Sequence, residues 1–350
     1  MTPLQSIILL AALAFTTASG AAVDGGGKTA PLFTSNDVLE VTMSAPFKQI
    51  MRGRSNTEDT PGTLTYEDPE AGETTLDIGI RTRGRFRRQE DICPFAPLRL
   101  NFSKTKGTVF AKSKKLKLVT HCRSGSTIYS QAVLREYLAY RILNTVTDQS
   151  FRVRLLHVKY IDDTNGNVVD TNYAILIEHR DQLAKRIGKD VSKAETTAVS
   201  ALDGRHTNIG SVFQYLIGNT DFSPVKGVPG EPCCHNYVLM GGGEGKMLSI
   251  PYDFDVTGIV SPPHAVPNPR FHLRNVRQRL YRGRCDNNEY LDSTLQLFSD
   301  KRQALFDLVN SVPGLNNSST KKTLRFVAEF YKTIDSPKHV ERYLVGKCLR

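Results

Sequence analysis

Oxygen-bearing side chains follow one another late in the chain, in the stretches GNTD, HN and PYDFD, as Asp221, Asn236, Asp253 and Asp255. The pattern places Asp221 after a helix, Asn236 at the head of a strand, and Asp253 at the end of the next strand. A hairpin returns its far end to its start, so Asn236 and Asp253 are expected to face one cation. Carboxylate and amide oxygens suit Mg²⁺, and phosphoryl transfer also needs an Asp that orients the attacking hydroxyl. The spacing therefore predicts a magnesium–nucleotide site, although a single Asp beside a turn is usually a turn or cap residue.

Two other motifs lack a residue that their chemistry requires. GGGEGKM, at 241–247, has one residue too few before its lysine for a phosphate-cradling loop, and Met247 stands where Ser or Thr would hold magnesium. HCRSGSTI, at 121–128, has Ile128 where a cysteine phosphatase has its arginine. We expect a tight hairpin turn for the first motif, and for Cys122 a disulfide in preference to a reactive thiol beside Arg123.

Strand-like segments dominate the first half of the chain. Alternating or β-branched patterns predict strands at 39–45, 74–84, 96–102, 115–121, 151–163 and 167–179, the last two joined by a turn at Asn165 and Gly166. Between them, apolar residues at spacings of three and four predict a helix over 126–146, capped by Ser126 or Thr127. Helices follow at 180–188, 209–219, 271–282, 290–312 and 320–334, with a strand pair at 236–240 and 246–253.

This order predicts an α+β fold of two lobes with a ligand between them. We expect a linker over 23–40, a strand-rich nucleotide-binding lobe over 41–178, and a helix-rich lobe with the catalytic and metal-binding residues over 179–350. Residues 1–22 are uncharged and contain an apolar run at 7–15, which favours an export signal over a buried N-terminal helix, although no basic residue precedes the run. The protein is therefore expected to be secreted or periplasmic, with no membrane span.

The six cysteines are expected to form disulfides in an exported chain. We predict a bond between Cys93 and Cys122, and bonds that join Cys233 or Cys234 to Cys285 or Cys348. The formal net charge of +11 favours phosphates, nucleotides or acidic polymers as partners. The chain has no Trp and no helix-turn-helix or zinc-finger spacing, so sequence-specific reading of DNA is not supported.

The order GNTD, HN and PYDFD, with LREYLAYRIL and AILIEHRDQLAKRIG upstream, resembles the CotH-like (spore-coat protein H type) kinases. These belong to the atypical protein-kinase-like folds, together with the HipA-type toxin kinases. The resemblance extends over about residues 75–285. It implies a two-lobed protein-kinase-like fold, ATP and Mg²⁺ or Mn²⁺ as cofactors, and transfer of the terminal phosphate to a protein acceptor or to the kinase itself.

The resemblance also implies a role for each matching residue. Asp221 would be the catalytic Asp, Asn236 and Asp253 the magnesium ligands, and Asp255 a supporting or alternative ligand. The phosphate-binding lysine would be Lys117, held by an ion pair with Glu136 on the helix, while Lys115 shares its face and Arg99 is a rival. Residues 178–180, beginning with Glu178, would pass beside the adenine, mainly through backbone groups.

Two features depart from the family pattern. Asp221 and Asn236 are fifteen positions apart, so the insert between them, with Pro224, Pro229 and Pro232, must loop out. No glycine-rich phosphate lid is recognisable, and RTRGRFRR at 81–88, which includes Arg83, either binds phosphates or forms a basic surface strand.

The alternative to an active kinase is a catalytically silent kinase-like protein or a basic protein that binds polyanions. The second would use RTRGRFRR and RNVRQRLYRGRC, the latter at 274–285. In a kinase, Arg274, Arg277 and Arg282 would select an acidic substrate or hold a phosphate, and the plain alternative is a solvated helix face.

Overall fold

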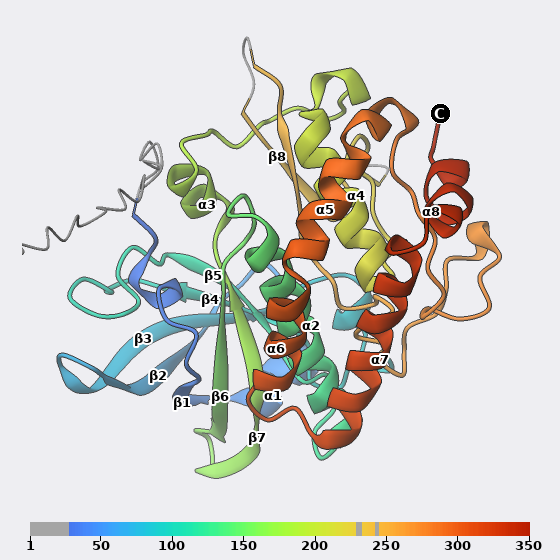
Figure 1. Ribbon diagram of the computed structural model, residues 1–350. Coiled ribbons are helices and arrows are strands. Elements are labelled where there is room, and N and C mark those ends of the chain that lie inside the picture. Colours follow the sequence, from blue (N-terminus) through green and yellow to red (C-terminus); the bar gives the residue numbers. More distant parts are fainter. Residues whose placement is uncertain (1–27, 229–232, 242–244) are drawn as a thin grey trace, which may run out of the picture.

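The computed structural model describes residues 28–228, 233–241 and 245–350, so the predicted signal peptide over 1–22 lies outside the described residues. The first half of the chain contains a closed barrel of seven strands and the second half is mainly helical, which confirms the predicted α+β class (Figure 1). No helix within the described ranges combines the length and apolar composition that crossing a membrane requires. The barrel strands are β1 (Leu39–Ala45), β2 (Thr60–Asp68), β3 (Gly72–Thr82), β4 (Leu98–Phe102), β5 (Lys115–Val119), β6 (Val153–Asp162) and β7 (Asn167–Ile177).

The helices and a short hairpin complete the chain. Helix α2 interrupts the barrel strands, and the hairpin of β8 and β9 interrupts the later helices. Their bounds are α1 (Phe47–Gly53), α2 (Thr127–Val146), α3 (Arg180–Arg186), α4 (Gly204–Ile217), β8 (Tyr237–Met240), β9 (Leu248–Pro251), α5 (Leu291–Asp300), α6 (Arg302–Ser311), α7 (Asn317–Ile334) and α8 (Pro337–Tyr343).

The barrel closes because β1 pairs with both β2 and β6. The strand order is β1-β2-β3-β4-β5-β7-β6, and neighbours are antiparallel except for β1 and β6, which run parallel with Val41 opposite Val158. Successive side chains of a strand point to opposite faces, and in β5 Leu116 and Leu118 are buried in the barrel core. Lys117, between them, therefore points to the outer face.

The β6–β7 hairpin separates two apolar cores. Leu156 and Leu176 belong to the core inside the barrel, whereas Leu155 and Ile175 belong to a second core built with the helices. Near the open end of the hairpin both faces are buried, at Leu155 and Leu156 of β6 and at 174–177 of β7, whereas β7 next to the turn is exposed or half-buried. The two halves of the chain share this wall.

Helix α2 leaves the barrel and packs into the helical core, beside α6 and β7 (Figure 1). Thirteen of its twenty residues are buried, as expected for a helix surrounded by protein. Ser126 occupies the predicted N-cap position, but its side chain makes no capping hydrogen bond. The helix is therefore positioned by burial and not by its cap.

Several predictions of secondary structure differ from the structure. Strand β2 was not predicted, because Pro61 and Gly62 near its start resemble strand breakers. Gly62 is needed there, since a Cβ atom would lie 2.8 Å from the Ser44 carbonyl oxygen. The predicted helix over 290–312 is divided at Lys301 into α5 and α6.

The predicted helix over 271–282 is wrong, and with it the suggestion of a solvated helix face. After a 3₁₀ turn at Pro269–Phe271 the segment is irregular. Arg279 Nε donates to the Leu216 carbonyl oxygen at 3.2 Å, and its guanidinium lies 3.8 Å from the centre of the Phe326 ring. Arg282 Nη1 donates to the carbonyl oxygens of Thr220 and Phe222. These contacts draw the segment along the surface of the helical core.

Three disulfides are present. The predicted bond between Cys93 and Cys122 is confirmed. The prediction that Cys233 or Cys234 joins Cys285 or Cys348 is wrong, because Cys233 bonds Cys234 and Cys285 bonds Cys348. A short parallel bridge between Arg284 and Leu349 brings the last pair together.

Candidate active site

A row of cations crosses the outer face of three neighbouring strands. Arg81 of β3 lies opposite Arg99 of β4, and Arg99 lies opposite Lys117 of β5. Asp59 forms an ion pair with Arg81, with 3.5 Å between Oδ1 and Nε. Neither Arg99 nor Lys117 forms an ion pair within the described part of the chain. Like charges directly opposite one another destabilise a sheet, so this row favours a bound anion.

Lys117 connects the row to the second half of the chain. Its Nζ lies 4.2 Å from the centre of the Tyr252 ring, which follows β9. Burial, and after it the charge of Arg83, lowers the pKa of Lys117 to about 7, although Asp253 opposes the shift. Arg99 lowers the pKa in the same direction. The surroundings of Lys117 therefore hold an excess of positive charge that suits phosphate oxygens.

Arg83 and Lys115 differ in how they relate to this centre. Arg83 follows β3, and its charge acts on Lys117, Glu136 and Asp255, so it belongs to the site. Lys115 shares the outer face of β5 with Lys117 but is exposed.

Asp221 lies in the loop after α4, where Gly218 ends the helix with a φ of 67°. Its Oδ1 lies 2.7 Å from His235 Nε2, and its Oδ2 accepts a hydrogen bond from Asn236 Nδ2 at 3.2 Å. Burial opposes ionisation, but His235 and Asn236 outweigh it and hold the pKa of Asp221 below its ordinary value. The side chain is 44% exposed. Asp221 is thus an ionised carboxylate that an incoming group can reach.

The insert between Asp221 and Asn236 folds back on itself. The Ser223 amide donates to the His235 carbonyl oxygen at 2.9 Å, and the His235 amide donates to the Lys226 carbonyl oxygen at 3.2 Å. The predicted excursion is confirmed, because Asn236 contacts Asp221 in spite of the insert. Positions 229 and 232, with their prolines, lie outside the described residues.

Asn236 and Asp253 lie at the open end of the β8–β9 hairpin. The Tyr252 amide donates to the Asn236 carbonyl oxygen at 3.0 Å, and the Asp253 amide donates to Tyr140 Oη of α2 at 2.9 Å. Asn236 and Asp253 have positive φ angles of 56° and 65°, a costly conformation for these residues that recurs at ligand sites. Asn236 uses Nδ2 to bind Asp221, which leaves Oδ1 as an acceptor. In the described ranges the Asp253 carboxylate has no hydrogen bond or ion pair. These oxygens fit a hard divalent cation.

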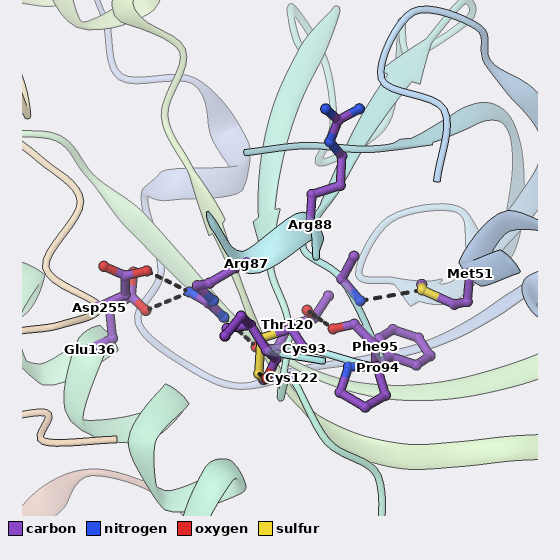
Figure 2. The surroundings of a disulfide bond; sticks show 12 residues. Met51, Arg87, Arg88, Cys93, Pro94, Phe95, Thr120, Cys122, Glu136 and Asp255 are labelled. Carbon is purple, nitrogen blue, oxygen red and sulfur yellow. Dashed lines mark hydrogen bonds and ion pairs between the residues drawn. A yellow bond between two sulfur atoms is a disulfide. The ribbon is translucent and has the colours of Figure 1, made fainter. Parts of the chain in front are cut away.

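Arg87 is the centre of a buried ion cluster (Figure 2). Its Nη1 lies 3.2 Å from Asp255 Oδ2 and 3.6 Å from Glu136 Oε2, and its Nη2 donates to the Thr120 carbonyl oxygen at 3.0 Å. Burial raises the pKa of Glu136 to about 8. Burial, and after it the charge of Asp253, raises the pKa of Asp255 to about 6. The positive charge of Arg87 opposes both pKa shifts, so Arg87 is the residue that stabilises the ionised forms of Glu136 and Asp255.

The cluster changes two expected roles. Glu136 pairs with Arg87, and no ion pair joins it to Lys117 among the residues described, so the predicted Lys117–Glu136 pair is wrong. The reason is that Lys117 is directed at Tyr252, whereas Glu136 is buried inside the protein. Asp255 is held by Arg87 and is less available as a metal ligand than Asp253. Arg87 was missed because nothing in RTRGRFRR distinguishes it from its surface neighbours.

Glu178 has a structural role that the sequence did not predict. Its Oε2 lies 2.9 Å from Arg186 Nη2 and accepts a hydrogen bond from the Arg152 amide at 3.0 Å, while its own amide donates to the Arg152 carbonyl oxygen. The side chain is fully buried. Glu178 therefore fixes α3 to the start of β6 through its carboxylate and its amide, and the expected adenine contact of 178–180 would have to use their other backbone groups.

A scan against protein-family models and a search of curated proteins both found no match to this chain.

Proposed function

We propose that this protein is an exported ATP-dependent kinase with a two-lobed protein-kinase-like arrangement, which transfers the terminal phosphate of ATP to a protein or to itself. The barrel half would supply cations for the phosphates, and the helical half would supply the catalytic and metal-binding oxygens. The three disulfides support export.

The observation that carries this proposal is the approach of Lys117 to the end of the β8–β9 hairpin. Lys117 contacts the ring of Tyr252, and Asp253 is the next residue. Asn236, bonded to the Tyr252 amide, also bonds Asp221. An excess of cations opposite oxygen donors is the arrangement that a metal-bound triphosphate requires.

Each residue has a defined task in this reaction. Asp221 accepts the proton of the acceptor hydroxyl while that oxygen bonds to the terminal phosphorus and the bond from phosphorus to the ADP oxygen breaks. The lowered pKa of Asp221 keeps it ionised for this task. Lys117, with Arg83 and Arg99, binds the phosphate oxygens. Asn236 and Asp253 would hold Mg²⁺ or Mn²⁺, which neutralises phosphate charge when bound.

A second candidate is a protein that binds nucleotide without transferring phosphate, and the pairing of Glu136 with Arg87 favours it. The polyanion-binding alternative has less support. Arg87, Arg279 and Arg282 each direct their guanidinium groups to carboxylates, carbonyl oxygens or aromatic rings within the protein.

Label transfer from ATP with a radioactive terminal phosphate tests the proposal. The purified protein is incubated with Mg²⁺ or Mn²⁺ and a generic acidic protein, and compared with Asp221→Asn and Asp253→Asn. Both variants should lose at least about 100-fold in transfer rate, because one lacks the base and the other a metal ligand. Asp292→Asn, at an exposed position of α5, is the matched control and should keep full activity.

Nucleotide binding is measured in parallel by equilibrium dialysis. Binding without transfer in the wild type would establish the second candidate. Absence of both binding and transfer would contradict the kinase proposal.

A further inference from the structure

A cavity of about 590 Å³ lies between the start of α2, the start of α7 and the loops that contain Ser261 and Arg277. We name it the α2–α7 cavity. Its lining shares no residue with the candidate active site. Its size is within the range of small-molecule sites, about 300–1,000 Å³. It is therefore a separate space that a small ligand can enter.

The lining of the α2–α7 cavity is strongly cationic. Arg135, Arg277, Lys322 and Arg325 face a single carboxylate, that of Glu329. Glu329 forms its ion pair with Arg279, outside the cavity, at 3.6 Å. None of the four cations forms an ion pair in the parts of the chain that are described. Arg277 is partly engaged within the protein, because its Nη1 donates to the Gly258 carbonyl oxygen at 3.4 Å and its guanidinium lies 4.7 Å from the centre of the Phe326 ring. The cavity thus holds positive charge that the protein does not neutralise.

Arg135 is the buried member of this group. Arg135 is 9% exposed. Its guanidinium forms no hydrogen bond or ion pair among the described residues, and its Nε is buried without a hydrogen-bond partner. Burial, and after it the charge of Arg277, lowers the pKa of Arg135 to about 10. A buried unpaired charge is costly. A guanidinium in this state at the wall of an open cavity indicates that its partner comes from outside.

The starts of two helices add to the positive potential. Thr127 and Ile128 begin α2 and line the cavity. The side chain of Ser126, at the N-cap position, makes no capping hydrogen bond to that helix. Ser318 and Ser319, in the first turn of α7, also line it, but Asn316 Oδ1 accepts a hydrogen bond from the Ser319 amide at 2.8 Å, so only the amides before Ser319 remain for an anion there. The first amides of a helix lack intrahelical acceptors and favour anions.

Gln131 holds the two helix starts together. Its Nε2 donates to the Gly314 carbonyl oxygen at 2.9 Å, and its Oε1 accepts a hydrogen bond from the Asn316 amide at 2.9 Å. The turn before α7 is therefore fixed to α2 without any ligand. This wall of the cavity is thus preformed.

We propose that the α2–α7 cavity binds a small polyanion that carries at least two phosphate groups, with Arg135 as its buried anchor. Phosphate oxygens match the planar donor geometry of arginine and the amides of helix starts. Four cations exceed the need of one phosphate group, and the hydroxyls of Thr127, Ser261 and Ser318 supply further donors.

Calorimetric titration with inorganic diphosphate at low salt tests the proposal on the full chain. The titration uses both the wild type and Lys117→Met, which removes a cation of the candidate active site. Diphosphate should still bind to Lys117→Met. When Arg135→Gln or Lys322→Gln is introduced into either parent protein, the affinity for diphosphate should fall at least tenfold. Arg141→Gln, on the same helix but outside the cavity, is the matched control and should bind as tightly as its parent. Diphosphate that binds only at the active site would instead be lost in Lys117→Met and unaffected by Arg135→Gln.

Thermal unfolding gives a second readout that a merely structural arginine would not produce. Without ligand, Arg135→Gln should unfold at the same or a higher temperature than the wild type, because a buried unpaired charge is removed. Diphosphate should raise the Tm of the wild type and leave that of Arg135→Gln unchanged. If Arg135→Gln fails to fold, exposed Lys322 carries the test through Lys322→Gln. Equal affinity in the cavity variants and the wild type, or no binding of diphosphate, would overturn the proposal.

Discussion

Arg87, at the scale of single residues, pairs with two carboxylates from distant parts of the chain, the buried Glu136 and the partly buried Asp255. A buried ion pair contributes little compared with an apolar replacement of the whole pair, but removal of one partner leaves the other uncompensated. Arg87→Met should therefore reduce the free energy of unfolding by about 3–5 kcal/mol. Urea unfolding followed by circular dichroism measures the change.

The next residue provides the matched control. Arg88 is half-buried, points away from the carboxylates (Figure 2), and donates to the Arg54 carbonyl oxygen at 3.3 Å. Arg88→Met should cost less than about 1 kcal/mol. Equal losses in the two variants would mean that the cluster has no special stabilising role.

The candidate site was predictable only in part. The order of Asp221, Asn236 and Asp253 indicated that a hairpin would gather them, since hairpin pairing is local in sequence. The partner of Glu136 could not be predicted, because whether an arginine is buried depends on contacts with residues distant in sequence. Arg87 and Asp255 are 168 positions apart.

At the scale of elements, α4 contains a buried histidine whose protonation opposes folding. Burial lowers the pKa of His206 to about 4, although Asp203 opposes the shift, whereas an unfolded histidine has a pKa of about 6.5. Between these values the unfolded chain binds more protons, so stability falls as the pH falls from about 6.5 to 4. Protonation of this residue lowers the free energy of unfolding by about 3 kcal/mol as the pH falls through that range.

His206→Gln should remove this part of the pH dependence. Urea unfolding at several pH values between 4 and 7 should give a shallower slope for the variant than for the wild type. His339→Gln, at an exposed position of α8, should keep the slope of the wild type. Parallel slopes for all three proteins would contradict the assignment.

Alternation and helical spacing predicted most elements because they depend on neighbouring residues. The strand at 39–45 and the helix at 126–146 agree with β1 and α2 to within a residue. The segment over 271–282 was misassigned because its arginines and apolar residues mimic an amphipathic helix, while their partners are carbonyl oxygens elsewhere. The closure of the barrel was not predictable either, since β1 and β6 pair across more than a hundred residues.

At the scale of the whole molecule, the bond between Cys285 and Cys348 ties the end of the chain back to the start of the final helices. The cysteines are separated by 63 positions, and the chain-entropy model gives such a link about 4 kcal/mol. Replacement of both cysteines by serine should reduce the free energy of unfolding by an amount of that order.

The adjacent pair Cys233 and Cys234 is the natural comparison. Its sequence separation is 1, so its removal changes loop entropy very little. Serine at both positions should leave the free energy of unfolding nearly unchanged, as measured by denaturant unfolding under non-reducing conditions. A larger loss from this pair than from Cys285 and Cys348 would contradict the entropic explanation.

The position of α2 in the chain has a consequence for synthesis. One of its apolar faces packs against α6, which begins about 155 residues after α2 ends, and at about 5–20 residues per second a ribosome takes on the order of 10–30 s to synthesise that stretch. During that interval the barrel strands can find one another, since β6 and β7 follow α2 directly. Helix α2 can then pack against β6 and β7 but still lacks α6. The nascent chain thus passes through a stage in which a finished barrel carries a helix with one apolar face uncovered, the form that a chaperone would recognise.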